Sequence, residues 1–172
     1  MTTLPARFPH DAPAASTVIL APHVHTAQQA WADAIVALGQ ARVEGAPREN
    51  LVELAGEALD QLYAYDLGPV LFKPTRAVDR PFRSTREAAL SYFVGGDIAE
   101  DAGFALQPWV HVEFINDQIM PLGDSTLAMG RYVFTEATTL RRVTAEYTFG
   151  YRRDAQGRVR IHLHHSSVPY SA

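Results

Sequence analysis

The last segment of the chain, residues 158–170, limits the fold more than any other stretch, because apolar and polar side chains alternate along it. Successive side chains of a strand point to opposite faces. One face of this strand should therefore carry Val159, Ile161, Leu163, His165 and Ser167. The other should carry Arg160, His162, His164 and Ser166. An apolar row that ends in an imidazole and a hydroxyl either meets water at a sheet end or lines a polar pocket, and we favour the pocket.

The segments before this strand also show the alternation of strands. Residues 110–115, 125–135 and 140–152 are the candidates, and residues 158–168 complete the set. The turn Asp154–Gly157 should join the last two strands as an antiparallel hairpin. The aromatic stripe Tyr147, Phe149 and Tyr151 is typical of a sheet core and not of a cofactor site.

The first half of the chain predicts helices instead. Residues 1–25 hold four prolines and should form an irregular arm. A helix should follow with Thr26 as its N-cap, and a second should cover residues 48–65. After a short strand at residues 70–72, Ser84 and Glu87 form a capping box for a helix that ends at residues 95–96.

Helices followed by long antiparallel strands predict an α+β fold with the N-terminal helices packed on one face of the sheet. We expect a strongly bent antiparallel sheet that forms a cone, with its mouth capped by the helices and a ligand pocket inside. The domain organisation is then an N-terminal arm, residues 1–25, and a single domain, residues 26–172.

Composition excludes several classes of function. The net charge is −4 and no run of Lys or Arg exceeds two residues, so neither a nucleic acid nor an anionic membrane is an expected partner. No Cys is present, which excludes thiolate zinc sites and cysteine nucleophiles. No apolar run approaches the roughly 20 residues that span a bilayer. The N-terminus lacks a signal-peptide pattern, so we expect a cytoplasmic protein.

Four polar residues are candidates for chemistry. Thr75 follows the short strand, Tyr92 lies within a helix expected to face the core, and His165 and Ser167 end the apolar row of the last strand. Three hydroxyls beside an imidazole can bind a small oxyanion and orient a water. Each also has a structural interpretation: a turn threonine, a core tyrosine, and a strand end that meets solvent.

A metal site is the next interpretation. His162 and His164 share one predicted face, and His111 can join them from a neighbouring strand. Metal sites in proteins usually have three or more ligands with carboxylate support. No Asp or Glu is placed with these histidines, and Arg160 on the same face disfavours a cation, so we predict no metal.

Several motifs together resemble one family. They are residues 65–75 (YDLGPVLFKPT), residues 82–97 (FRSTREAALSYFVGGD), residues 127–130 (LAMG) and residues 164–170 (HHSSVPY). These segments are similar to the iota-class carbonic anhydrases of bacteria and algae. That family belongs to the nuclear transport factor 2-like superfamily and is close to the association domain of calcium/calmodulin-dependent kinase II. The resemblance extends from about Thr26 to the C-terminus.

The resemblance implies a carbonate dehydratase, a lyase that reversibly hydrates carbon dioxide to bicarbonate without a cofactor. Other members have been described as using zinc or manganese, for which His162, His164 and His165 would be the ligands here. The family's bicarbonate pocket of threonine, tyrosine and serine falls on Thr75, Tyr92 and Ser167. His165 then becomes the candidate proton acceptor, Phe72 and Phe93 hold carbon dioxide, and His164 and Ser166 are further pocket residues. A homodimer or higher homo-oligomer is the implied assembly.

The choice between Ser166 and Ser167 depends on the strand register, because a slip of one residue exchanges the two faces. Two other functions stay open. The domain can be a non-catalytic oligomerisation or small-ligand-binding module like the kinase association domain. A polyketide-cyclase-like or isomerase-like enzyme would need an inward Asp or Glu, and the sequence pattern points to none.

Overall fold

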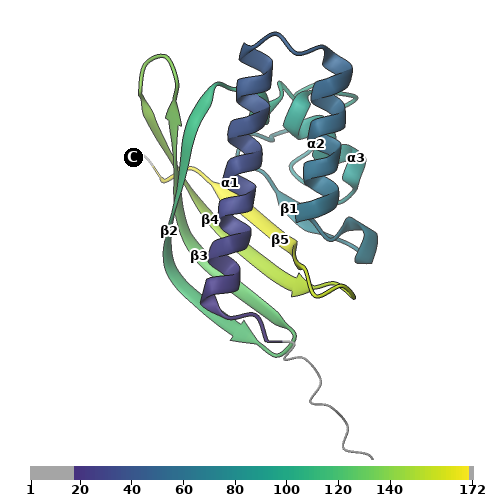
Figure 1. Cartoon of the computed structure of the whole chain (residues 1–172), viewed down its shortest axis with the longest axis vertical. Helices are drawn as coiled ribbons and strands as arrows, with labels where there is room; N and C mark the ends of the chain where they lie inside the picture. The colour runs from purple at the N-terminus through teal and green to yellow at the C-terminus, as the bar shows by residue number, and fades with distance from the viewer. Residues whose placement is uncertain (1–17, 171–172) are drawn as a thin grey trace, which may run out of the picture.

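A computed structural model describes residues 18–170, which form a bent five-stranded sheet with helices on one face (Figure 1). The helices are α1 (Ala21–Val43), α2 (Arg48–Leu62) and α3 (Arg86–Val94). The strands are β1 (Leu71–Lys73), β2 (Trp109–Leu122), β3 (Ser125–Glu136), β4 (Arg142–Arg153) and β5 (Val159–Ser167). The α+β prediction is confirmed. Across residues 18–170, no helix combines the length and the apolar character that a membrane span requires.

The first helix begins earlier than the sequence pattern predicted. α1 starts at Ala21 with Pro22 in its first turn, where a missing N–H costs the helix nothing. Thr26, the predicted N-cap, lies inside the helix and donates a hydrogen bond to the Pro22 carbonyl at 3.0 Å. The predicted arm of residues 1–25 is therefore too long at its C-terminal end, and residues 1–17 lie outside the described part of the chain.

The start of α3 is also displaced by one residue. Thr85, not Ser84, is the N-cap, and its hydroxyl accepts the Ala88 N–H at 3.2 Å. The Thr85 backbone is extended, as an N-cap requires. The helix itself and its end at Gly95 are as predicted.

The sheet has the order β1-β5-β4-β3-β2. Strands β2 to β5 pair antiparallel with their neighbours in the sequence, as predicted, and β1 adds parallel to β5 at the edge. At the β4–β5 turn the Asp154 carboxylate accepts the N–H groups of Gln156 and Arg158, and Gly157 has a φ of 78°. The predicted hairpin is confirmed.

The long helix α1 crosses the concave face of the sheet (Figure 1). Its Trp31 is buried in the core between helix and sheet. The indole stacks on Tyr132 of β3 with ring centroids 5.7 Å apart and meets Phe114 and Phe149 edge-on. A large aromatic group at this point fills the inside of the curved sheet. The core therefore lies between α1 and strands β2 to β5.

Strand β5 contains an irregularity that decides which of its residues face this core. Gly150 of β4 pairs with Leu163, but the next residue, Tyr151, pairs with Ile161, so His162 has no partner of its own. This is a β-bulge, with one extra residue in β5. A Cβ on Gly150 would lie 2.9 Å from the Leu163 Cβ, so glycine permits the close approach at the bulge.

The bulge exchanges the two faces of β5 beyond His162. His164 and Ser166 are buried, with 3% and 2% of their surfaces exposed, whereas His165 is exposed and Ser167 is half-buried. The prediction that His165 and Ser167 face the core is therefore wrong. The predicted faces hold up to Ile161. The extra residue, His162, then moves each later side chain of β5 to the face opposite the predicted one.

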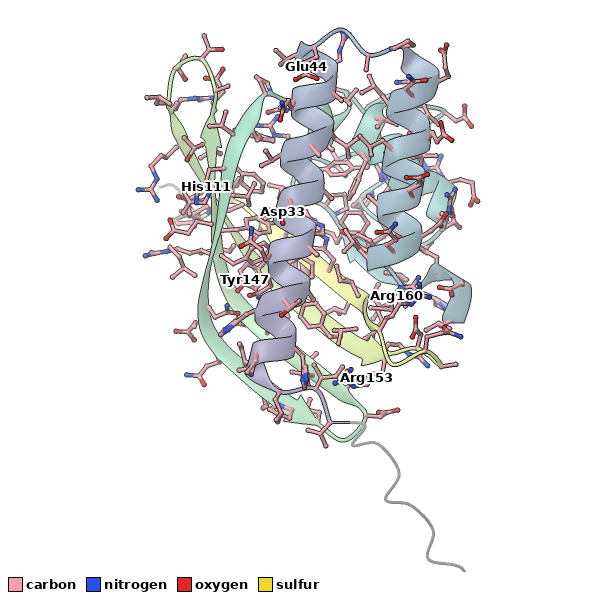
Figure 2. The ribbon with its side chains drawn as sticks, viewed as in Figure 1. Asp33, Glu44, His111, Tyr147, Arg153 and Arg160 are labelled. Atoms are coloured by element: carbon pink, nitrogen blue, oxygen red, sulfur yellow. The ribbon has the colours of Figure 1, made fainter. Side chains whose placement is uncertain are left out.

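Arg160, at the start of β5, ties this strand to the end of α2 (Figure 2). Its buried guanidinium donates to the Asp154 carboxylate at 3.0 Å, to Asp66 at 2.9 Å and to the backbone carbonyl of Tyr63 at 2.5 Å. Buried charges are tolerated when they are paired and hydrogen-bonded in this way. The network holds the backbone at Tyr63, directly after α2, against β5.

Candidate active site

A small cavity lies between α1, α3 and the inner face of the sheet. The free volume of the cavity is about 10 Å³, which is close to the space that one water molecule needs. Its walls are mainly aromatic with a few hydroxyls. The lining residues are Trp31, Phe72, Pro74, Thr75, Tyr92, Phe93, Phe104, Tyr132, His164 and Ser166. None of these described residues is an Asp or Glu.

Three hydroxyls meet at one end of this cavity. The Ser166 hydroxyl accepts a hydrogen bond from Tyr132 and is hydrogen-bonded to the Thr75 hydroxyl. Tyr132 comes from β3, Ser166 from β5 and Thr75 from the segment after β1. Ser166 and Tyr132 are buried and Thr75 is half-buried, so the three run from the interior toward the surface. Groups of this kind donate to and accept from a small anion or a water.

Thr75 reaches Ser166 because β1 lies beside β5. Phe72 pairs in parallel with His164, and the Lys73 ammonium donates to the Ser166 carbonyl at 3.3 Å. Pro74 is buried and ends the strand, since it has no N–H to continue the ladder. The Thr75 side chain is therefore placed at the cavity by the register of the sheet.

The segment after Thr75 is held by a buried ion pair. The Arg83 guanidinium is fully buried and donates to Asp101 at 2.5 Å and to Glu100 at 3.4 Å. The Glu100 carboxylate accepts the backbone N–H groups of residues 78–80, and these bonds lower its pKa to about 2. The two carboxylates therefore fix the loop that carries Thr75.

Tyr92 forms another part of the cavity wall. It lies on α3, is buried, and stacks on Phe104 with ring centroids 5.5 Å apart. Burial raises the pKa of the Tyr92 hydroxyl to about 12, although a backbone N–H of Arg76 partly offsets this effect. The hydroxyl is therefore neutral at physiological pH and can donate a hydrogen bond.

His164 lies beneath the hydroxyls and is enclosed by aromatic rings. Its imidazole stacks between Phe149, at 4.1 Å, and Phe72, at 4.6 Å. The Nδ1 atom is 2.8 Å from the Tyr63 hydroxyl and the Nε2 atom is 3.4 Å from the Tyr132 hydroxyl. Burial lowers the pKa of His164 to about 3. The ring is therefore neutral at physiological pH and is no proton acceptor there.

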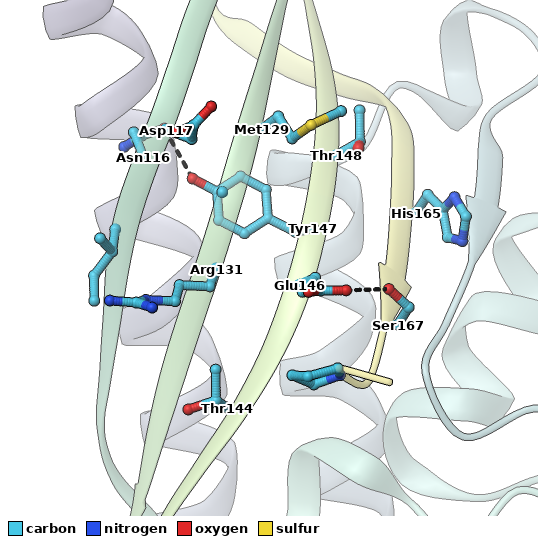
Figure 3. Close-up of a pocket in the computed structure, with 13 residues that line it drawn as sticks. Asn116, Asp117, Met129, Arg131, Thr144, Glu146, Tyr147, Thr148, His165 and Ser167 are labelled. Carbon is cyan, nitrogen blue, oxygen red and sulfur yellow. Dashed lines mark hydrogen bonds between the residues drawn. The ribbon is translucent and has the colours of Figure 1, made fainter. Parts of the chain in front are cut away.

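Six of the residues named from the sequence line this cavity: Thr75, Tyr92, Phe72, Phe93, His164 and Ser166. His165 and Ser167, the two predicted from the uninterrupted alternation, do not. They line a wide groove on the outer face of the sheet, where Ser167 donates to Glu146 at 3.3 Å (Figure 3). The geometry therefore assigns the serine of the cavity to Ser166 and its imidazole to His164.

Sequence reasoning missed four members of the cavity: Trp31, Pro74, Phe104 and Tyr132. Tyr132 shares a strand face with Phe134, and both are buried, so its inward direction was readable from the alternation. Trp31 and Phe104 carry no local signal, because aromatic residues of a core look alike in a sequence whether or not they border a pocket.

The three histidines considered as metal ligands point to different places. His162 is hydrogen-bonded to Ser125 at 2.8 Å, His164 is bonded to Tyr63 inside the core, and His165 lies on the outer face. His111 lies on β2, at the opposite edge of the sheet from β1 and β5 (Figure 2). In residues 18–170 no three His, Asp or Glu side chains gather closely enough to hold a metal ion.

A family model described as metal-independent carbonic anhydrase matches residues 22–168. The chain belongs to this family. It is 40% identical over 161 residues to the metal-independent carbonic anhydrase of Nostoc sp. strain PCC 7120, an alignment that covers 92% of this chain and 78% of that protein.

Two solved structures are similar to this chain. A cyanobacterial iota-carbonic anhydrase, in complex with bicarbonate, matches with a TM-score of 0.87 and 38% identity over 94% of this chain and 99% of that one. A nuclear transport factor 2-like protein with a cystatin-like fold, from Novosphingobium aromaticivorans, has a TM-score of 0.50 at 14% identity, covering 88% of this chain and 87% of that one. The second likeness concerns the fold alone. The predicted nuclear transport factor 2-like fold is confirmed.

Proposed function

We propose that this protein, as an iota-class carbonate dehydratase, hydrates carbon dioxide in the cavity of Thr75, Tyr92 and Ser166 without a cofactor. The observation that carries the proposal is a small cavity bordered by Thr75, Tyr92 and Ser166, in which the Ser166 hydroxyl is bonded to the hydroxyls of Thr75 and Tyr132 against aromatic walls. The small size favours a substrate of very few atoms. An isomerase-like or cyclase-like enzyme lacks support, because no carboxylate lines the described cavity.

In this mechanism the aromatic side chains hold carbon dioxide and the hydroxyls hold the attacking water. Phe72 and Phe93 form apolar walls beside the hydroxyls. The water oxygen attacks the carbon, a C–O bond forms, and one C=O electron pair moves onto oxygen. Hydroxyl donors stabilise this developing negative charge because they are already oriented before the reaction.

The proton released by the water needs an acceptor other than His164, because burial keeps the pKa of that ring near 3. His165 was predicted for this role, but it lies on the outer face of the sheet. Thr75 is the least buried of the cavity hydroxyl residues, so we propose that the proton leaves to solvent water on its side.

Stopped-flow measurement of carbon dioxide hydration tests the proposal with Tyr92→Phe and Thr75→Val. Each substitution removes a hydroxyl and little volume, so we expect a folded protein with kcat/KM lowered roughly 10²-fold or more. Tyr151→Phe is the matched control, because that buried ring lies on β4 and outside the cavity lining. Full turnover in both cavity variants would exclude the assignment. Bicarbonate binding with no turnover in the wild type would favour a binding module instead.

We also propose that two copies associate through the groove on the outer face of the sheet. The groove measures about 840 Å³ and carries Met129, Arg131 and Glu146 on neighbouring strands (Figure 3). Arg131 and Glu146 are exposed, have opposite charges and lie opposite each other on strands β3 and β4. A two-fold axis at this groove can therefore pair Arg131 of each copy with Glu146 of the other.

Analytical ultracentrifugation of Arg131→Glu, Glu146→Arg and the double exchange tests this assembly. Dimers weakened in both single variants and restored in the double variant would support it, and a monomeric wild type would exclude it. The cytoplasmic location stays a prediction from the sequence, to be checked by cell fractionation.

A further inference from the structure

The buried imidazole at the cavity is connected to a second polar group deeper in the core. Trp31 Nε1–H donates to the Tyr63 hydroxyl oxygen at 2.9 Å, and that hydroxyl lies 2.8 Å from His164 Nδ1. Trp31, Tyr63 and His164 come from α1, from the residue after α2, and from β5. Each is almost completely buried, so no solvent can satisfy their polar atoms. Each proton in this group must therefore have a defined direction.

The indole fixes the first direction. An indole N–H can only donate, so the Tyr63 oxygen is the acceptor. Tyr63 then has one proton of its own, and His164 Nδ1 is the acceptor within reach. If Nδ1 carried a proton instead, the Tyr63 oxygen would accept twice and its own buried O–H would have no acceptor. An unsatisfied buried donor is costly, so Nδ1 is the acceptor.

A neutral imidazole with an unprotonated Nδ1 carries its proton on Nε2. That proton points to the Tyr132 oxygen at 3.4 Å, and the Tyr132 hydroxyl donates to Ser166. The Ser166 proton is then available for the Thr75 oxygen. The Thr75 proton is the last one, and it is left for a ligand in the cavity. All protons of this set therefore point from the core toward the site.

We infer that Tyr63, held by Trp31, is a positioning residue that fixes His164 as the Nε2–H tautomer and so directs the hydroxyl protons of Tyr132 and Ser166 toward Thr75, whose own proton is then the donor to the bound anion. This inference rests on the proposed function for its catalytic consequence. The tautomer itself follows from the geometry alone. Trp31 and Tyr63 are ordinary core residues in all other respects, and only their hydrogen bonds in this network make them positioning residues for His164.

Nitrogen NMR of the histidine side chains tests the tautomer directly. The resonances of His164 are assigned by their loss in His164→Gln. In the wild type we expect a protonated, pyrrole-type Nε2 and an unprotonated, pyridine-type Nδ1 at neutral pH. In Tyr63→Phe the Nδ1 atom loses its donor, so both tautomers should become populated. Tyr151→Phe, which removes another buried hydroxyl, should leave the His164 signals unchanged.

Activity gives the second readout. Tyr63→Phe should lower kcat by about tenfold or more with a smaller change in KM, because the hydroxyls stay in place and lose only their common direction. A wild-type Nδ1–H tautomer, or a Tyr63→Phe variant with unchanged tautomer and unchanged kcat, would overturn the inference. A wild type with the Nε2–H tautomer and no carbon dioxide hydration would instead overturn the proposed function and leave the tautomer assignment standing.

Discussion

Substitution of the two neighbouring serines of β5 distinguishes the observed strand register, which has a bulge at His162, from the register without a bulge that the sequence pattern predicted. Ser166→Ala removes the acceptor of the Tyr132 hydroxyl and the partner of Thr75. Tyr132 is buried, so its unsatisfied O–H should cost about 1–3 kcal/mol in the free energy of unfolding. Without Ser166 the Thr75 hydroxyl is no longer oriented as a donor to developing charge, and loss of one such donor should lower kcat by roughly 10²–10³-fold. Urea unfolding and stopped-flow hydration measure the two effects.

Ser167→Ala is the matched control. The Ser167 hydroxyl is half-buried and bonds only to an exposed carboxylate, Glu146, at 3.3 Å. Its removal should change the free energy of unfolding by no more than about 0.5 kcal/mol and leave turnover intact. The reverse result, in which Ser167→Ala loses turnover and Ser166→Ala keeps it, would refute the bulge at His162 and the face assignment built on it.

Two further perturbations test groups that support the cavity. Burial lowers the pKa of His164 from 6.5 to about 3, so below pH 6.5 the unfolded chain binds a proton that the folded one does not. The free energy of unfolding should therefore fall with decreasing pH, by up to about 1.4 kcal/mol per unit from this residue, and His164→Gln should flatten the urea-midpoint profile between pH 7 and 5. Asp101→Ala leaves the buried Arg83 cation with Glu100, at 3.4 Å, as its one remaining carboxylate partner among the described residues, which should cost about 3–5 kcal/mol in urea unfolding.

Each of these two predictions has a control in the same chain. Ser167→Ala should keep the wild-type pH profile, because it removes no ionisable group. An equal flattening in Ser167→Ala would contradict the burial argument for His164. Glu113→Ala breaks an exposed pair with Arg142 and should cost no more than about 1 kcal/mol. Equal losses in Asp101→Ala and Glu113→Ala would contradict the structural role of the buried pair.

The sequence patterns that predicted the fold were long and regular. Alternation over β3 and β4, the turn at Asp154–Gly157 and the apolar stripes of the helices each extend over several residues, so a single irregularity did not hide them. The start of α1 was placed too late because the four prolines of residues 1–25, Pro22 among them, predicted an irregular arm. Proline in the first turn is compatible with a helix.

The candidate site was harder, because one residue decides a strand face. The extra residue His162 moves His164 and Ser166 inward, and no feature of β5 itself announces the bulge. The available signal lies on the partner strand, where Gly150 interrupts an otherwise bulky stripe. Tyr63 and Trp31 were beyond reach, since only the packing of α1, α2 and β5 brings their polar atoms to His164.

Carbon dioxide hydration by metal-depleted protein tests the central claim most directly. The protein is treated with a chelator, its residual zinc and manganese are determined by mass spectrometry, and turnover is recorded by stopped flow. The cavity of Thr75, Tyr92 and Ser166 predicts unchanged kcat with metal far below one ion per chain. Turnover that falls with the metal content, and returns only when zinc or manganese is added, would contradict it.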